Sequence, residues 1–303
     1  MAKIDKSQYT KAQWQIVKAS RRKEKEENRA RKAQSNAPTE QDNKQAIPPV
    51  EAVIPPRESM VSSQPNTTKN YVVCLKHGSK YSSEYVNKLH SMCKRHLTVP
   101  FEFVCFTDDL RGIDGNIKTI ALKQNGLSGW WYKPMFFDKN LGVDGTLLYM
   151  DLDIVINANI DHLFTYQPDK FCIIRDFNRS IRHDWNRMNS SVFRLKTGSL
   201  PYVYDNFMES HEVNIRRFHG DQDWIYEQVG PNKQEWVFWP DEWILSYKWE
   251  MRDRSQLVKV HGQPRNFKTT ADPKVLPKTC IAVFHGEPHP HQCEDAWVKE
   301  NWK

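Results

Sequence analysis

Apolar and polar positions follow a regular pattern only from about residue 70 onward. Residues 71–75 form a short apolar run, residues 83–96 place apolar side chains at helical spacing, and residues 101–106 form a second apolar run. Short apolar runs favour strands, and the 3.6-residue period favours a helix. The succession of strand, helix and strand predicts an α/β fold.

The same pattern continues further along the chain. Residues 117–122 form a candidate third strand, and we expect a helix around residues 130–139, with Pro134 tolerated near its first turn or at a kink. Residues 146–150 are almost wholly apolar, which is typical of a central strand covered on both faces. Another strand is expected over residues 280–284.

The first 68 residues differ in composition from the rest. Residues 7–34 lack Gly and Pro and are rich in strong helix formers, which favours a solvated helix. Residues 35–69 contain two Pro-Pro pairs and many small polar residues, which predicts a disordered linker. We therefore expect a charged helix and linker over residues 1–68, followed by one folded domain over residues 69–303.

The formal net charge of +7 belongs mostly to the first region. Residues 1–68 carry 13 Lys and Arg against 8 Asp and Glu, so the folded region is close to neutral. The basic region could contact a nucleic acid or an anionic membrane surface, or it could be a solvated spacer. The acidic residues that interrupt the basic run favour the spacer.

Membrane, secreted and disulfide-bonded classes are not indicated. The sequence has no run of 18 apolar residues, and its first residues lack the apolar core of a secretory signal. We expect a cytoplasmic protein that is not secreted and has no transmembrane segment. The six cysteines are widely spread without a Cys-x-x-Cys motif, so buried free thiols are expected.

Two aspartates follow the expected central strand directly. Asp151 and Asp153 are separated by one residue, so their side chains share a face in extended geometry. Open α/β sheets bind ligands at the carboxyl ends of their strands. Paired carboxylates suit Mg²⁺ or Mn²⁺, which usually complete their coordination with substrate phosphates. The motif indicates a metal site for a nucleotide diphosphate, although such triplets also occur in ordinary loops.

Histidines follow the strand expected over residues 280–284. His285 precedes Gly286, so an imidazole could reach a metal where the backbone turns sharply. His289 and His291 are alternative ligands or exposed turn residues.

Two more polar clusters lie between the aspartates and the histidines. Asp221 opens an expected helix, and it could be either a functional carboxylate or a simple N-cap. Residues 189–191, Asn-Ser-Ser, enter an expected strand, where small side chains would permit close approach by a ligand. A plain loop is the alternative interpretation of that triplet.

In chain order, these motifs resemble those of the GT-A glycosyltransferases, particularly family 8. The resemblance covers residues 70–300 and rests on the apolar strand with Asp-Leu-Asp at 151–153, Asn-Ser-Ser at 189–191, Gly-Asp-Gln-Asp at 220–223 and His-Gly-Glu-Pro at 285–288. It implies a Rossmann-like GT-A domain with a central mixed sheet. It also implies transfer of a sugar from a nucleotide-sugar to an acceptor hydroxyl, with retention. The acceptor would be a glycan, a lipid-linked molecule or a protein.

The resemblance assigns a metal site and a nucleotide site. Asp151, Asp153 and His285 would hold Mn²⁺ or Mg²⁺ on the diphosphate of the donor, for which a UDP-sugar is favoured. Further contacts to the nucleotide-sugar would come from residues in the loops around it: His77, Gly78, Asp108, Lys133 and Gly286. The lysine that the family has after its histidine is absent from this sequence, so His289 or a lysine elsewhere would have to supply that phosphate contact.

The resemblance also assigns residues to the transferred sugar. Asp221 would bind hydroxyls of the donor sugar, Gln222 would face its anomeric carbon, and Asn189 would lie beside it. Aromatic residues are abundant in the folded region, and we expect Trp130 or Trp185 to line the acceptor cleft.

Two other functions are consistent with the same residues. A metal-dependent phosphohydrolase or nuclease could use a set of carboxylates and histidines as ligands: Asp151, Asp153, His219, Asp221, His285 and His289. A non-catalytic binding module could act through the basic region alone.

Overall fold

The computed structural model describes residues 68–303, except for residues 124, 253–256, 261–262 and 268–271. The chain divides into two units, Met1–Ser62 and Ser63–Lys303, and all of the described residues belong to the second. The helix, linker and surface contact expected over residues 1–68 lie almost wholly outside the described residues.

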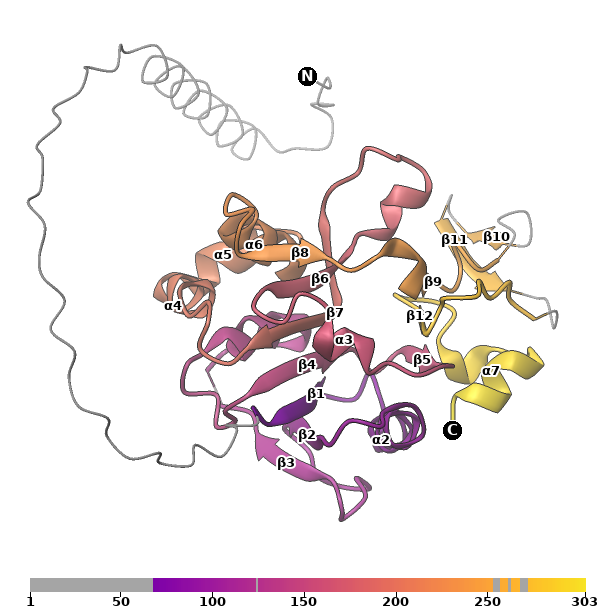
Figure 1. Ribbon diagram of the computed structural model, residues 1–303, viewed down its shortest axis with the longest axis horizontal. Coiled ribbons are helices and arrows are strands. Elements are labelled where there is room, and N and C mark those ends of the chain that lie inside the picture. Colours follow the sequence, from indigo (N-terminus) through magenta and orange to yellow (C-terminus); the bar gives the residue numbers. More distant parts are fainter. Residues whose placement is uncertain (1–67, 124, 253–256, 261–262, 268–271) are drawn as a thin grey trace, which may run out of the picture. The chain divides into compact units, whose positions relative to one another are not determined.

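A mixed seven-stranded sheet forms the centre of the second unit, with strand order β3-β2-β1-β4-β7-β6-β8 (Figure 1). Neighbouring strands are parallel from β3 to β4, whereas β7 is antiparallel to both β4 and β6, and β8 is parallel to β6. The strands are β1 (Asn70–Lys76), β2 (Glu102–Thr107), β3 (Lys118–Ala121), β4 (Thr146–Met150), β6 (Phe171–Arg175), β7 (Met188–Lys196) and β8 (Trp236–Phe238). The predicted mixed α/β sheet is confirmed, and β4 is central in it.

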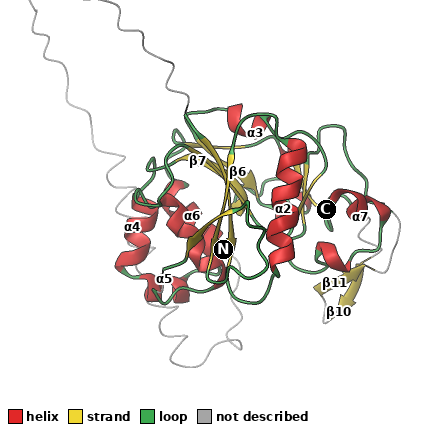
Figure 2. Cartoon of the chain, turned by 90° about the horizontal axis from the view of Figure 1, so that it is seen from below, coloured by secondary structure: helices red, strands yellow, loops and turns green. Residues whose placement is uncertain are grey.

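Helices cover both faces of this sheet (Figure 2). Because successive strand residues point to opposite faces, Val72 of β1 joins a core cluster with α2, whereas Val73 joins a second cluster with α4 and α6. The helices are α2 (Ser83–His96), α3 (His162–Thr165), α4 (Tyr202–Glu209), α5 (His211–Arg217), α6 (Asp221–Val229) and α7 (Ala296–Asn301). Short 3₁₀ helices are η2 (Gly129–Phe137), η3 (Phe177–Ser180), η4 (Asp241–Trp243) and η6 (Pro290–Gln292).

A small three-stranded sheet joins the end of the chain to its middle. Its order is β5 (Ile154–Ile156), β12 (Ile281–Val283) and β9 (Ile244–Ser246). The antiparallel pairing of β12 with β5 lets Phe284 donate its N–H to the carbonyl of Asp153 at 3.0 Å. The histidine motif after β12 is thereby placed beside the aspartate motif after β4. Strands β10 (Leu257–Val260) and β11 (Gln263–Phe267) form a separate antiparallel pair.

Three local expectations change in the structure. The helix expected over residues 130–139 is the 3₁₀ helix η2, whose interior holds Pro134, a residue without an N–H for α-helical bonding. Residues 189–191 lie inside β7 and are buried, so the loop interpretation is wrong. Asp221 is the first residue of α6 and Gly220 is the N-cap, so the N-cap interpretation of Asp221 is also wrong.

Two broader expectations can be compared with the described residues. All six cysteines are free and buried, as expected. Within residues 68–303, as far as the structure describes them, no helix is both long and apolar enough to cross a membrane.

Candidate active site

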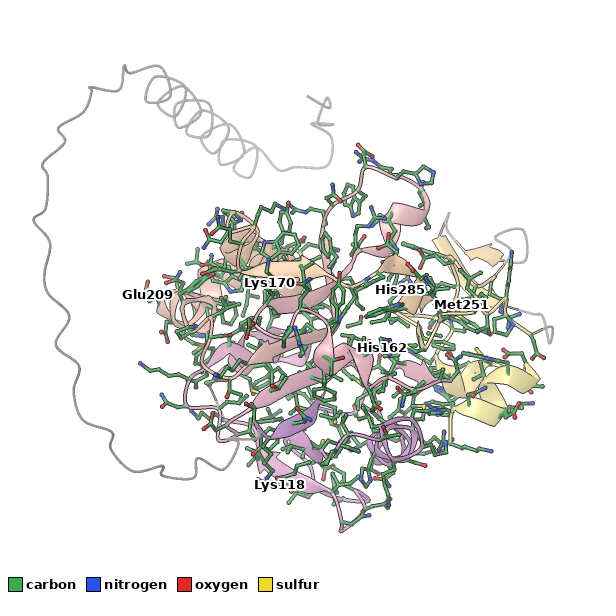
Figure 3. All side chains as sticks on the ribbon, viewed as in Figure 1. Lys118, His162, Lys170, Glu209, Met251 and His285 are labelled. Atoms are coloured by element: carbon green, nitrogen blue, oxygen red, sulfur yellow. The ribbon has the colours of Figure 1, made fainter. Side chains whose placement is uncertain are left out.

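A cavity of about 530 Å³ opens at the carboxyl ends of the central strands. Its wall contains most of the residues singled out in the sequence, drawn from six separate segments of the chain: His77, Lys133, Asp151, Asp153, Asn189, Asp221, Gln222, His285 and Gly286. His285, which Figure 3 labels, belongs to the loop after β12. It lines the cavity from that loop. The topology therefore brings together motifs that are far apart in the sequence.

Lys133 is buried between two carboxylates on the floor of this cavity. Its ammonium lies 2.9 Å from Oδ1 of Asp151 and 3.9 Å from Oδ2 of Asp221, and it donates to the Ser190 hydroxyl at 3.2 Å. Burial alone would lower the pKa of Lys133, but the two carboxylates outweigh it and the pKa is raised. Lys133 is therefore a fixed cation that holds the aspartate motif against α6.

The two aspartates of the Asp-Leu-Asp motif have different surroundings. Asp151 accepts a hydrogen bond from Tyr149 at 2.7 Å in addition to its contact with Lys133. Asp153 is more deeply buried and accepts from the Tyr81 hydroxyl at 2.8 Å. Burial raises the pKa of Asp153, and the negative charge of Asp151 adds to the shift.

The polar triplet of β7 contacts the beginning of α6. The Ser190 hydroxyl donates to Oδ2 of Asp221 at 2.5 Å, and the Asn189 amide donates to Oε1 of Gln222 at 3.4 Å. Burial raises the pKa of Asp221, although Lys133 and Ser190 oppose that shift. The small side chains of the triplet thus let α6 approach the sheet closely enough for Asp221 and Gln222 to reach the cavity.

His285 lies on the same wall but is held by its own contacts. Its ring stacks on Phe177, with centroids 5.0 Å apart, and its Nε2 is 2.6 Å from the hydroxyl oxygen of Ser246. Burial lowers the pKa of His285 to about 3, and the neighbouring Lys248 adds to this. The imidazole is therefore neutral at pH 7, the form that binds metals.

Lys248 fastens the loop that carries His285. Its ammonium donates to the carbonyl oxygens of His285 at 2.8 Å and of Glu287 at 3.0 Å, and burial lowers its pKa to about 8. Gly286, between these residues, has a φ of +91°, which L side chains rarely adopt. Lys248 lies directly behind the wall of the cavity, since a Cβ added to Gly286 would be 3.4 Å from its ammonium.

The expected nucleotide-binding loops lie on two sides of Tyr81. His77 lines the main cavity, and its Nδ1 accepts a hydrogen bond from the Gly129 N–H at 3.1 Å. Gly78 and Asp108 line an adjacent hollow instead, where the Gly78 N–H donates to both oxygens of Asp108 at 3.1 Å. Tyr81 lines both spaces and so connects them.

Sequence reasoning missed Tyr81 and Lys80, which also line the main cavity. Both follow β1, a strand whose carboxyl end faces the site, and that position is the signal that could have identified them. Their contacts with Asp153 depend on tertiary structure. The Tyr81 hydroxyl donates to Asp153, and the Lys80 charge offsets part of the rise that burial causes in the pKa of that carboxyl.

The predicted metal ligands are only partly assembled. Asp151 and Asp153 share the cavity wall, and their mutual repulsion is the kind of excess negative charge that a divalent cation relieves. His285 is bonded through Nε2 to Ser246, so ligation would use Nδ1 or require that bond to break. In the part of the chain that the structure describes, no three His, Cys, Asp or Glu side chains are grouped closely enough to hold a metal by themselves.

The ligands considered for a metal-dependent phosphohydrolase or nuclease are not assembled either. His219 lines the cavity, but His289 does not, and its Nδ1 is 4.0 Å from Oδ2 of Asp153. The six ligands considered for that class do not form a metal cluster among the described residues.

Comparison with known proteins shows likeness at the level of the fold. No protein-family model and no curated protein matches the chain. The structure of an active-site mutant of LgtC is similar over 76% of this chain and 93% of LgtC, with 14% identity and a TM-score of 0.52. The galactosyltransferase LgtC in complex with donor and acceptor sugar analogues gives the same coverage and identity, with a TM-score of 0.48.

A third similar structure belongs to a longer protein. The glycosyltransferase GlyE of Streptococcus pneumoniae is 12% identical, with a TM-score of 0.46, over 73% of this chain and 56% of GlyE. The chain thus spans little more than half of the GlyE chain. The likeness to LgtC, together with the mixed sheet and the placement of its motifs, shows that this chain has the GT-A fold that its sequence predicts.

Proposed function

We propose that the protein is a glycosyltransferase that moves a sugar from a nucleotide-sugar donor to an acceptor hydroxyl. The observation that carries this proposal is the convergence of Asp151, Asp153, Asp221 and Gln222 on one cavity of a GT-A fold, around the buried Lys133. These groups come from the end of a strand and the start of a helix, and Asp151 and Gln222 are 71 positions apart in the sequence. Polar side chains that converge on a cleft at the carboxyl ends of the strands of an α/β fold usually mark a ligand site.

A divalent cation, Mn²⁺ or Mg²⁺, is part of the proposal. Asp151 and Asp153 would hold it, and the donor diphosphate would complete its coordination, because the protein carboxylates alone are too few. Bound there, the ion would neutralise the charge that develops on the departing nucleoside diphosphate. Within this proposal a UDP-sugar remains the favoured donor.

The residues of the chain then have separate tasks. Asp221, fixed by Ser190 and Lys133, binds hydroxyls of the donor sugar. Gln222, whose amide is oriented by Asn189, faces the anomeric carbon. Holding the acceptor oxygen near that carbon contributes to catalysis, because positioning removes the entropy cost of bringing the reactants together.

The proposed reaction retains the configuration at the anomeric carbon. The acceptor oxygen forms a bond to the anomeric carbon while the bond between that carbon and the diphosphate oxygen breaks. The proton of the acceptor hydroxyl passes to the departing diphosphate. No side-chain base is then required.

The test is a donor screen with the purified chain. UDP-, GDP- and CMP-sugars are offered with Mn²⁺, and both the thermal shift and the release of free nucleotide are measured. We expect one donor class to stabilise the protein and to be turned over, and Gln222→Ala to lower turnover by about 10²-fold with little change in melting temperature. Cleavage of a generic phosphodiester, without stabilisation by any nucleotide-sugar, would support a phosphohydrolase instead.

A further inference from the structure

Trp130 and Trp131 are consecutive, but their side chains lie in opposite environments. The Trp131 side chain is buried and stacks on Phe207, with ring centroids 5.8 Å apart and an interplanar angle of 10°. Trp130 is 52% exposed and lines the wall of the main cavity. An indole left in contact with water gains free energy when a ligand covers it, so its place on a cavity wall points to a binding role.

The position of Trp130 is set by the backbone on both sides of it. Gly129, immediately before it, has a φ of +55° and donates its N–H to Nδ1 of His77 at 3.1 Å. Immediately after it, the Trp131 N–H donates to the carbonyl of Ser128 at 3.1 Å. These two hydrogen bonds therefore fix the backbone on both sides of Trp130.

The indole edge lies against the beginning of α6. A Cβ added to Gly220 would be 3.9 Å from Nε1 of Trp130, and Gly220 directly precedes Asp221 and Gln222. His219 and Asp223 line the cavity on the same segment and carry hydrogen-bonding groups. An apolar ring face next to several polar side chains matches a sugar ring, which has an apolar C–H face and a rim of hydroxyls.

We propose that Trp130 is the platform on which the ring of a sugar acceptor stacks, with hydroxyls of that ring bonded by His219 and Asp223. This inference rests on the proposed function and selects a glycan among the acceptor classes. Trp130 adjoins the α6 segment assigned to the transferred sugar, whereas Gly78 and Asp108 of the nucleotide loops line a different hollow. A ring on Trp130 therefore lies next to the reacting sugar.

The experiment compares Trp130→Ala, Trp130→Phe and Trp185→Ala in the full chain. Trp185, the other tryptophan expected from the sequence at the acceptor cleft, is the matched control, because it does not line the cavity and its indole donates to Asp176 at 2.9 Å. Each variant receives UDP-glucose or UDP-galactose with Mn²⁺ and an acceptor from one of three classes. The first class is a methyl glycoside of glucose, galactose or N-acetylglucosamine. The second is a serine-containing peptide, and the third is a long-chain alcohol. The readouts are the acceptor KM, the donor KM, and the ratio of transfer to donor hydrolysis.

We expect a methyl glycoside to be the best acceptor of the unaltered chain. Trp130→Ala should raise the acceptor KM at least tenfold more than the donor KM and lower the ratio of transfer to hydrolysis about tenfold. Trp130→Phe should recover part of the loss, because it keeps an aromatic face, and Trp185→Ala should leave the ratio unchanged.

Two results would overturn the inference while leaving the proposed function intact. One is a preference for the peptide or the alcohol that Trp130→Ala does not alter, and the other is an equal rise of donor and acceptor KM in that variant. If the unaltered chain neither binds nor hydrolyses any nucleotide-sugar, the proposed function fails and this inference fails with it.

Discussion

The ammonium of Lys133 lies 2.9 Å from Oδ1 of Asp151, inside a cavity wall where both side chains are largely shielded from water. The same ammonium is 3.9 Å from Oδ2 of Asp221, so one lysine compensates two carboxylates that come from β4 and α6. The charge balance of the site therefore depends on a residue of the 3₁₀ helix η2, which precedes both elements in the chain.

Replacing Lys133 by methionine should destabilise the protein strongly. The substitution keeps most of the length of the side chain but leaves two buried carboxylates without their cation, which costs about 3–5 kcal/mol. Urea unfolding measures the effect. The matched control is Lys139→Met at an exposed position of the same segment, which should stay within about 0.5 kcal/mol of the unaltered protein. Equal effects at the two positions would show that the charge of Lys133 is not needed for the fold.

Replacing Asp153 by asparagine should separate stability from metal binding. Because burial and Asp151 raise the folded-state pKa of Asp153, ionisation of this carboxyl costs stability once the pH rises above the unfolded-state pKa. Asparagine removes the charge and can still accept from Tyr81, so the melting temperature without metal should not fall.

The stabilisation of this variant by Mn²⁺ with UDP should be lost, with Mn²⁺ affinity reduced at least about tenfold. Thermal shift with and without EDTA measures both properties. Asp114→Asn, at an exposed turn, is the control and should keep the full metal-dependent shift. An undiminished shift in Asp153→Asn would remove this carboxylate from the proposed metal site.

Gly286 should not tolerate a side chain. Its φ of +91° is unfavourable for alanine, and the new Cβ would meet the Lys248 ammonium at 3.4 Å, so Gly286→Ala should lose about 1–3 kcal/mol of stability. Gly115→Ala is the control, because a Cβ there meets nothing within 4 Å and its φ is not positive. Calorimetry of both variants tests the prediction, and a neutral Gly286→Ala would show that the loop carrying His285 adapts freely.

Removing residues 1–62 should leave the KM for the nucleotide-sugar and the rate of donor turnover within about twofold of the full chain. The described residues that line the cavity all lie between Leu75 and Gly286, in the second unit. Steady-state kinetics of the shortened chain measure both constants. A large rise in KM would show that the first unit contributes to the donor site.

Local pattern was sufficient for the elements that hold the aspartates. The apolar run over residues 146–150 predicts β4 because a strand buried on both faces needs continuous apolar side chains, and Asp151 and Asp153 follow it without a gap. The start of α6 at Asp221 is similarly local, although its N-cap is Gly220. These features depend on neighbours within a few residues.

The hydrogen-bond partners of the site residues lie far away in the sequence. The bond of Tyr81 to Asp153 spans 72 positions, and the bond of Ser246 to His285 spans 39. The pairing of β12 with β5 is a choice among several short apolar strands that sequence pattern alone does not rank. The parallel pairing of β12 with β9 then places Ser246 within 2.6 Å of the His285 ring.

By itself, the sequence determined the α/β class, the central strand and the chemical types present in the site, because periodicity, apolar runs and carboxylate spacing are properties of short segments. Tertiary structure alone decided that Lys133 is shared by Asp151 and Asp221, that Lys248 fastens the loop of His285, and that Trp130 stays exposed while Trp131 is buried. Charge compensation and burial depend on which distant segments meet, and that follows from strand order and packing in three dimensions.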